Sequence, residues 1–431
     1  MVLPLVVFLV FLGLLMGGLW APFSIAAAAL LYIYLEGGVF GLRAIGLASW
    51  GGLYSFTLTA VPLFLLMAEV LLQSGVANRV YRGLSRIVRR LPGGLLQTNI
   101  VGCAVFSAIS GSSVATAAGI GTVAMPQLLQ RGYSRKLSAG SLAGGGTLGI
   151  LIPPSIAMII YGTFTETSVS QLFMAGIIPG LMTVALFMLL IGVLALIKPS
   201  IAPRETATEE PPVNWTETAA DLLPFSLVIL VTLGSIYFGI ATPTEAAAVG
   251  SVISIAVGVI WGNLSWSVFL TALRNTTRTS ASLLFIVLAA FLFSYAIGID
   301  GFGRDLSAWL LEQELSKPML LLAIILLYLI LGCVVESIGI MVITLPVLYP
   351  ILLAYDIDLI WFGVVLVLLI ELGQLTPPLG INLFVIQSIW EGKLEEVVQG
   401  TIPFFLIIFA MVFVLWTVPE LATWLPSLMV N

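Results

Sequence analysis

The sequence contains no histidine and only two cysteines in 431 residues. Histidine is the commonest metal ligand and the usual acid–base group near neutral pH, so its absence argues against zinc chemistry and Ser-His catalysis. Cys103 and Cys333 are too few for a disulfide framework or a metal cage. The apolar segments also hold no lysine that could activate a serine nucleophile. We therefore expect that the protein is not an enzyme.

Charge is scarce as well, at 9% of the residues, whereas 60% are hydrophobic. A membrane-spanning helix needs about 20 apolar residues, and ten windows qualify: 2–17, 19–36, 54–74, 137–165, 170–197, 222–241, 243–262, 279–299, 359–389 and 401–425. The first has no basic leader and no Ala-x-Ala site, so we expect a retained span. These windows predict an all-α polytopic membrane protein in contact with lipid. No basic stripe suggests nucleic acid.

The positions of the basic residues predict the orientation of the chain. If residues 76–94 are cytoplasmic, 13 of the 16 lysines and arginines fall on that side, and only Arg43, Arg304 and Lys317 lie outside. The positive-inside rule then places both termini outside. On this assignment no arginine falls within the membrane core to bind a carboxylate.

Two segments do not look like complete spans. The forty residues between Arg90 and Arg131 are uncharged, yet both flanks are basic and favour the same side. Two arms of about 15 residues reach only ~22 Å, short of the ~30 Å hydrocarbon core. We expect a re-entrant hairpin at 95–129 with the SGSS sequence at its tip, and a second hairpin at 318–353 with GCVVES at its tip.

An internal repeat relates these segments. A shift of 224 residues superposes two isolated prolines and a Pro-Pro pair on their counterparts: Pro126 on Pro350, Pro153 on Pro377, Pro154 on Pro378 and Pro179 on Pro403. Both copies read as hairpin, broken helix (137–165 and 359–389) and span, but in opposite orientations. This pattern predicts an inverted-topology repeat of 1–205 and 222–431, joined by a cytoplasmic linker at 206–221, as in many secondary transporters.

The paired prolines indicate where an ion binds. Proline cannot donate to the carbonyl four residues earlier, so the carbonyls of Gly149, Ile150, Gly373 and Gln374 are expected to be free. Such oxygens are tolerated in a membrane where protein, water or an ion satisfies them, and Na⁺ suits unwound backbone and hydroxyl groups. We predict two Na⁺ sites, the first at Ser110, Gly111, Ser112, Ser113, Thr147, Gly149 and Pro153, and the second at Glu336, Ser337, Gly373, Gln374 and Thr376. For an anionic substrate we expect helix amino ends and polar side chains at Ser112, Ser155, Thr376 and Asn382.

Several marked residues have more than one interpretation. Glu336 is predicted to be either a Na⁺ ligand or a proton carrier. Glu245 follows Thr242 at the spacing of a capping box, which favours a structural helix start. Glu69 and Glu371 are functional candidates because acids are rare in membrane segments, Glu371 the stronger because it precedes the second break.

Smaller patterns point to packing and to the membrane surface. GGG at 144–146 favours close helix packing. Segments 76–92 and 263–278 are expected to lie at the membrane surface, either as arms that brace a moving domain or as charge anchors.

Long stretches of the sequence resemble one family. ISGSSVATAAGIGTVAMPQLLQRGYSRKLSAGSLAGGGTLGILIPPSIAMIIYG at 109–162, TPTEAAAVG at 242–250 and ELGQLTPPLGINLFVIQSI at 371–389 are similar to the large membrane (M) subunit of tripartite ATP-independent periplasmic (TRAP) transporters. The resemblance implies a bacterial inner-membrane importer of a small organic acid, driven by Na⁺ and working by an elevator movement. It also implies two separate partner chains, a small four-helix membrane subunit (Q type) and a periplasmic substrate-binding protein (P type). The alternative is a stand-alone Na⁺- or H⁺-coupled carboxylate carrier of the wider ion-transporter superfamily.

Overall fold

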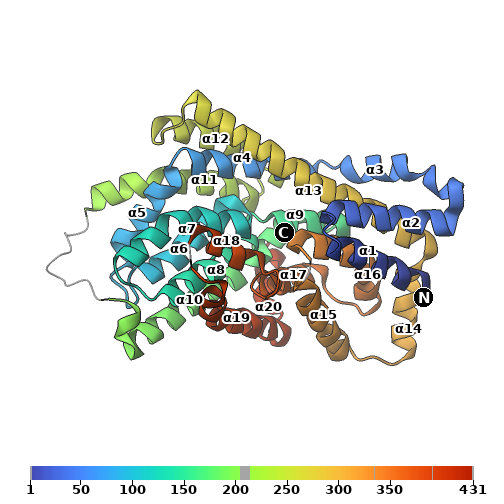
Figure 1. The fold of residues 1–431 in the computed structure, drawn as a ribbon. Helices are drawn as coiled ribbons and strands as arrows, with labels where there is room; N and C mark the ends of the chain where they lie inside the picture. The colour runs from blue at the N-terminus through green and yellow to red at the C-terminus, as the bar shows by residue number, and fades with distance from the viewer. Residues whose placement is uncertain (1, 204–213, 334, 391, 430–431) are drawn as a thin grey trace.

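The computed structural model describes residues 2–203, 214–333, 335–390 and 392–429, and within these ranges the secondary structure is helical without a strand (Figure 1). Residues 206–213 of the linker predicted at 206–221 lie outside the described residues, and from Trp215 onward the predicted linker is the first part of helix α11. The helices up to the linker are α1 (Val2–Met16), α2 (Ala21–Leu42), α3 (Ile45–Leu53), η1 (Thr57–Thr59), α4 (Ala60–Gln73), α5 (Val76–Val88), α6 (Leu95–Ser110), α7 (Ser113–Gln130), α8 (Arg135–Leu151), α9 (Ile156–Thr165), α10 (Val169–Ile197) and η2 (Pro199–Ile201). Those after it are α11 (Trp215–Tyr237), α12 (Pro243–Ile260), α13 (Trp266–Asp300), α14 (Phe302–Glu312), α15 (Lys317–Gly332), α16 (Ser337–Ala354), α17 (Leu359–Gln374), α18 (Ile381–Ile389), α19 (Leu394–Thr417) and α20 (Glu420–Ser427).

The polytopic all-α membrane architecture predicted from the sequence is confirmed. Eight helical segments in the described residues are long and apolar enough to cross a membrane. The predicted windows 2–17, 54–74 and 359–389 are not among them: the helices there are shorter or, near residue 54, bent by 61° against their neighbour. Conversely, Ser337–Ala354 meets the length and hydropathy of a span, although the sequence places it in the second hairpin. The re-entrant path of the two hairpins therefore stays a prediction.

Helix boundaries agree with the 224-residue shift. The shift carries the first and last residues of α7 onto those of α16, and it superposes α8 and α9 on α17 and α18 to within a residue at each end. The same shift carries the start of α5 to a position two residues before the start of α14. Helix α14 is therefore the counterpart of α5, the predicted arm at 76–92. The opposite orientation of the two copies stays a prediction.

The helices form two packed groups, visible in Figure 1. Helix α4 packs against α12 and α13, and α13 also contacts α2 and α3. In the second group α8 is central, with α6, α7 and α19 around it, and α18 lies against α7. Contacts of α13 with α16 and of α4 with α6 join the groups. Between them lie the loops that carry the predicted hairpin tips.

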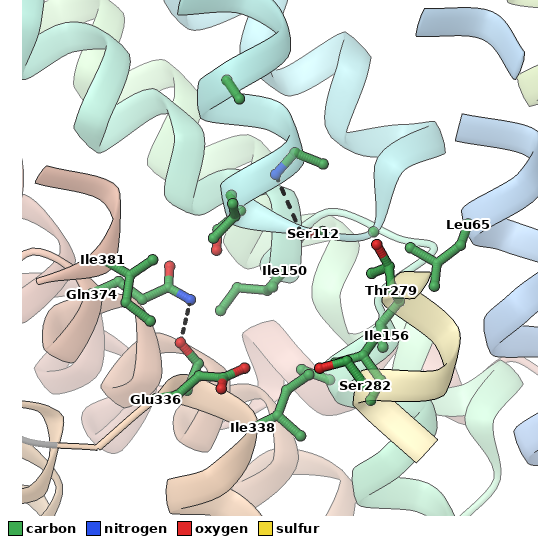
Figure 2. Close-up of a pocket in the computed structure, with 18 of the residues that line it drawn as sticks. Leu65, Ser112, Ile150, Ile156, Thr279, Ser282, Glu336, Ile338, Gln374 and Ile381 are labelled. Carbon is green, nitrogen blue, oxygen red and sulfur yellow. Dashed lines mark hydrogen bonds between the residues drawn. The ribbon is translucent and has the colours of Figure 1, made fainter. Parts of the chain in front are cut away.

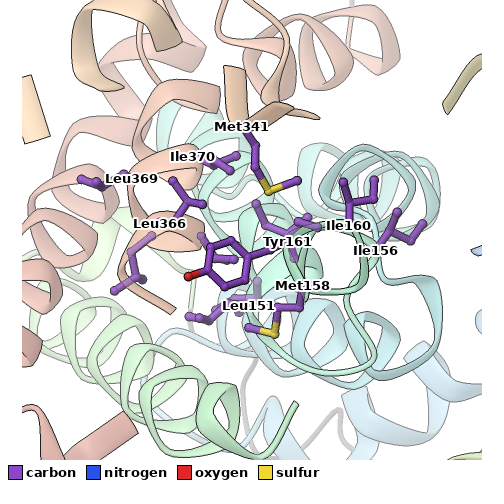
Figure 3. Packing of buried hydrophobic residues seen from close by; sticks show 14 of the residues in the cluster. Leu151, Ile156, Met158, Ile160, Tyr161, Met341, Leu366, Leu369 and Ile370 are labelled. Atoms are coloured by element: carbon purple, nitrogen blue, oxygen red, sulfur yellow. The ribbon is translucent and has the colours of Figure 1, made fainter. Parts of the chain in front are cut away.

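Apolar side chains from both halves of the chain fill the centre. Figure 3 shows Leu151, Met158 and Tyr161 from the first broken helix beside Met341, Leu366 and Ile370 from α16 and α17. The hydroxyl of Tyr161 donates to the carbonyl of Leu359 at 2.6 Å, which satisfies a buried polar group within this core. The two broken helices are thus held against each other.

Glycine allows the closest helix contacts, as the sequence predicts for 144–146. A Cβ at Gly144 would lie 2.7 Å from Phe404, and one at Gly146 would lie 2.6 Å from Ala117. The tightest crossing joins α8 and α19, where a Cβ at Gly400 would lie 1.8 Å from the Lys136 carbonyl oxygen. The small residues therefore fix α8 between α7 and α19.

The two predicted surface arms differ from each other. Helix α5 is amphipathic, but it ends at Val88, four residues before the predicted end of the segment at 92. The segment 263–278 is not a separate arm, because from Trp266 it is the first part of the 35-residue helix α13. No proline or glycine interrupts the sequence between Trp266 and Gly298, so nothing ends the helix there. The capping box of Thr242 and Glu245 is confirmed at the start of α12.

Candidate functional site

The first predicted tip lies directly on the first break. Gly111, with φ of 59°, turns the chain between α6 and α7, and its carbonyl accepts a hydrogen bond from the Ile156 amide at 3.2 Å. A Cβ at Gly149 would lie 2.5 Å from the carbonyl oxygen of Ser112, so only glycine allows this approach. The predicted grouping of the SGSS tip with the GILIPPS break is thus present in the structure.

The second tip meets the second break through a side-chain hydrogen bond. Gln374 Nε2 donates to Ser337 Oγ at 2.7 Å, and a Cβ at Gly332 would lie 2.5 Å from the Cα of Gly373. Thr376 Oγ1 donates to the carbonyl of Leu372 at 2.6 Å, so its hydroxyl is engaged within its own break. Val334, in the middle of the GCVVES tip, lies outside the described residues.

The two breaks are alike in their bonds but differ in burial. Both Pro-Pro peptide bonds, Pro153–Pro154 and Pro377–Pro378, are cis. The first pair is buried beneath the first tip, whereas Pro377 and Pro378 are exposed.

Three of the four carbonyls that the prolines were expected to free accept no hydrogen bond among the described residues. These are the carbonyls of Gly149, Ile150 and Gln374. The prediction is wrong for Gly373, because the amide of Thr376 donates to its carbonyl at 3.2 Å. This bond joins residues three apart, as in a 3₁₀ turn, and it closes the last helical turn before the second break. The second break therefore has one free carbonyl, whereas the first break has two.

Both tips line one cavity of about 490 Å³ between the two helix groups. Its walls include Gly111, Ser112 and Ser113 from the first tip, and Glu336 and Ser337 from the second. Figure 2 shows Gln374 and Ile381 on one side of this cavity and Leu65, Thr279 and Ser282 on the other. The cavity is therefore formed by hairpin tips, broken helices and the two helices α4 and α13.

Eight of the fourteen predicted site residues lie outside the lining of this cavity: Ser110, Thr147, Gly149, Pro153, Ser155, Gly373, Thr376 and Asn382. Ser155, Thr376 and Asn382, predicted to bind substrate, do not line it, whereas Ser112 does. Ser155 is buried and its Oγ accepts from the Met158 amide at 3.3 Å, so it begins α9 as an N-cap. Thr147 also lies away from the cavity, and its hydroxyl donates to the Gly144 carbonyl at 2.8 Å.

Glu371 and Asn382 leave buried oxygens without partners. Glu371 is fully buried beside Thr147, and neither of its carboxylate oxygens has a hydrogen-bond partner among the described residues. Asn382 is also fully buried; its Nδ2 donates to the Ala143 carbonyl at 3.4 Å, and its Oδ1 accepts no hydrogen bond there. Burying an unpaired polar group is costly, so this part of the chain is constrained by something other than stability alone.

Sequence reasoning missed several polar residues of the site. Thr116, one turn into α7, lies 2.6 Å by its Oγ1 from Ser110 Oγ, and it also faces Gly149. Arg278, assigned to the cytoplasmic surface in the sequence, lines the cavity together with Thr279 and Ser282. Because α13 runs as one helix through this position, Arg278 belongs to a candidate span rather than to a separate surface arm. That no arginine reaches the membrane core stays a prediction. The signal in the sequence was the continuous polar run RNTTRTS at 274–280, directly before an apolar segment.

Comparison with known proteins assigns the chain to a family. The sequence profile described as "Tripartite ATP-independent periplasmic transporter, DctM component" matches residues 8–421. The chain is 34% identical to a C4-dicarboxylate TRAP transporter large permease protein of Pseudomonas aeruginosa, over 86% of each chain. It is 30% identical to the sialic acid TRAP transporter large permease of Vibrio cholerae, over 97% of each chain. An isethionate TRAP transporter permease, DctMQ, of Oleidesulfovibrio alaskensis is 31% identical over 85% of this chain and 58% of its own length.

Two solved transporter structures share the fold. The YdaH transporter of Alcanivorax borkumensis gives a TM-score of 0.56 at 16% identity, covering 90% of this chain and 89% of its own. MtrF of Neisseria gonorrhoeae gives 0.59 at 12% identity, covering 88% and 85%. At these identities the likeness shows the fold alone. From its matching profile, its relatives and the eight apolar spans among its described residues, the chain belongs to the tripartite ATP-independent periplasmic transporter family as a DctM-type large permease, a multi-pass protein of the inner membrane.

Proposed function

We propose that the chain imports a small organic acid by Na⁺-coupled secondary transport. The observation that carries this proposal is that both hairpin tips line one cavity, each next to a helix break. Unsatisfied backbone carbonyls at such breaks are the oxygens that a dehydrated Na⁺ accepts in membrane transporters.

The first Na⁺ site is proposed at the contact of the SGSS tip with the first break. The carbonyls of Gly149 and Ile150, and the hydroxyls of Ser110 and Thr116, supply neutral oxygens there. A Cβ at Gly149 would collide with Ser112, so the glycine lets the tip approach the break. The tip and the break are then close enough for both to contribute ligands. Na⁺ binding then orders the tip before the substrate binds.

The second Na⁺ site is proposed at Glu336, Ser337 and Gln374. Glu336 brings a carboxylate to the cavity, and the cation would balance its charge. With Glu336 as a Na⁺ ligand, we expect transport at saturating Na⁺ to be flat between pH 6 and 8. Uptake that rises with a proton gradient at fixed Na⁺ would instead make Glu336 a proton carrier.

Relatives suggest the substrate class and the partners. Those named above carry the names of C4-dicarboxylate, sialic acid and isethionate transporters, and all three substrates are organic anions. We propose that a separate small membrane subunit completes the permease and that a periplasmic binding protein delivers the acid. The DctMQ relative supports the first point, since the matched region covers little more than half of it.

Uptake by proteoliposomes tests the proposal. Vesicles that contain the chain with its small membrane subunit, supplied with the binding protein, should accumulate a labelled organic acid only when Na⁺ is higher outside. Vesicles without the binding protein are the matched control. Accumulation that is equal in K⁺ and Na⁺ gradients contradicts Na⁺ coupling, and full uptake without the binding protein favours the stand-alone carrier.

A further inference from the structure

One wall of the cavity comes from elements outside the hairpins and breaks. Helix α13 contributes Arg278, Thr279 and Ser282, and α4 contributes Leu65 and Glu69. Residues 274–280 of α13, RNTTRTS, are all polar, and two of them, Arg278 and Thr279, line the cavity together with Ser282 one turn further on. Polar side chains within an apolar spanning helix are costly unless they face water, protein or a ligand. Arg278, Thr279 and Ser282 therefore mark the face of α13 that meets whatever enters the cavity.

Arg278 is the one basic side chain in the cavity lining, and it has no ion pair or hydrogen bond within the described part of the chain. Glu69 is held by two amides instead: its Oε2 accepts from Asn275 Nδ2 at 3.1 Å and from Gln73 Nε2 at 3.3 Å. The other carboxylate in the lining, Glu336, lies at the second tip, where a Na⁺ is proposed to balance it. The guanidinium of Arg278 thus remains available to an anion from outside the protein.

We propose that Arg278 is a specificity-determining residue that binds a carboxylate of the transported acid. The inference rests on the proposed function and identifies the group that recognises the anion. A guanidinium offers two parallel N–H donors that match a carboxylate, which a lysine does not reproduce. Thr279 and Ser282 add hydroxyl donors on the same wall, and about 490 Å³ suits a small organic acid. The acid would bridge α13 and the two tips.

Ligand-induced stabilisation of the purified full-length chain tests Arg278 without requiring transport. The probes are succinate and N-acetylneuraminate, with succinamide as the neutral counterpart of succinate, all in Na⁺ buffer. In wild type we expect at least one of the two acids to raise the unfolding midpoint and succinamide to leave it unchanged. In Arg278→Gln the concentration needed for half of this effect should rise about 10- to 100-fold, since a charge-assisted bidentate contact is lost. Arg278→Lys should fall between the two.

Arg274→Gln is the matched control, because Arg274 lies about one turn earlier on α13, is exposed and does not line the cavity. It should respond to the acids as wild type does. Equal half-effect concentrations in wild type and Arg278→Gln overturn the inference, and so does a wild type that neither acid stabilises. A wild type that binds acid through Arg278 but shows no Na⁺-driven uptake overturns only the proposed function.

A second measurement applies if Arg278→Gln does not fold. The variant Ser282→Cys places a thiol one turn beyond Arg278 on the same face and keeps the native arginine. It is made together with Cys333→Ser, because Cys103 is buried and the new thiol is then the accessible one. The acid that stabilises wild type should slow maleimide labelling of this thiol at least several-fold, and succinamide should not. Labelling at the same rate with and without the acid contradicts a carboxylate site on this wall.

Discussion

The contact between the first hairpin tip and the first break depends on the missing side chain of Gly149. Gly149 has room for a hydrogen and not for a methyl group, because a Cβ would lie 2.5 Å from the Ser112 carbonyl oxygen and 2.7 Å from Thr116 Oγ1. The atom it would strike first is backbone, which cannot rotate away as a side chain can. The same glycine exposes its own carbonyl at the break. Its absence of a side chain therefore serves both the packing and the proposed ion site.

We predict that Gly149→Ala displaces the SGSS tip and weakens the first Na⁺ site. The half-saturating Na⁺ concentration for uptake should rise at least tenfold, since even a small misplacement of ligands costs affinity. Gly234→Ala is the control, because no atom lies within 4 Å of the position of its added Cβ. An unchanged Na⁺ dependence in Gly149→Ala would mean that this contact is not part of an ion site.

Among the helices, α5 is fixed to its neighbour by charge. Asp221 of α11, with its side chain 7% exposed, lies 3.1 Å from Arg82 and from Arg86 and 3.5 Å from Arg79. The hydrogen bond from Arg82 to Asp221 raises the pKa of the Arg82 guanidinium. The cluster thus fixes α5 to α11 directly before the first predicted hairpin.

Removing this carboxylate should loosen the arm. Asp221→Ala leaves three arginines without their shared acceptor. We expect the free energy of unfolding to fall by about 1–2 kcal/mol, which is less than for a buried ion pair because the arginines are partly in solvent. The midpoint of thermal unfolding of the purified protein measures it. Glu217→Ala removes a single exposed pair with Arg86 and should change the midpoint little. Equal midpoints for the two variants would show that the cluster does not stabilise the arm.

The crossing of α8 and α19 depends on two glycines rather than on charge. In Gly400→Ala the added Cβ would lie 1.8 Å from the backbone oxygen of Lys136, so the two helices must separate. We expect a loss of about 1–3 kcal/mol of stability, as for other overpacked contacts, read as a lower unfolding midpoint. Gly298→Ala, where nothing lies within 4 Å, should leave the midpoint unchanged. An unchanged unfolding midpoint in Gly400→Ala would mean that α8 and α19 can move apart at this crossing without loss of stability.

The helices and their breaks can be predicted from the sequence better than the burial of the residues that form them. Proline pairs and the 224-residue shift locate both breaks, because proline acts on its own backbone. The burial of Pro153 and the exposure of Pro377 depend on which helices cover them, and no local pattern encodes that. The contribution of Arg278 to the cavity was not predicted for a similar reason. Charge counting assigns a residue to one side of the membrane, whereas the face that it presents on a 35-residue helix depends on tertiary packing.

At the scale of the whole molecule, the cavity lies between helices that belong to different packed groups. Its tips are carried by α6–α7 and α15–α16, whereas α4 and α13 form the facing wall. An elevator mechanism would require a moving unit, formed by both hairpins with their broken helices α8–α9 and α17–α18, to slide past that wall. Movement between these groups has a direct test, because α4 and α7 touch where a Cβ at Gly119 would lie 3.3 Å from Leu72 Cδ1.

We predict that a covalent link across this contact arrests transport. A Leu72→Cys and Gly119→Cys pair, made with Cys103→Ala and Cys333→Ser, joins α4 to α7 when treated with a mercuric ion. Uptake should then fall to background and return after a thiol is added. The control pair, Gly121→Cys with Ile389→Cys, links α7 to α18, where the Gly121 Cβ would lie 3.0 Å from Ile389 Cδ1. Because both helices of the control belong to the proposed moving unit, its link should leave uptake intact. If the first link formed fully and transport continued, α4 and α7 would have to travel together, and the cavity could not open by sliding of the hairpin past α4.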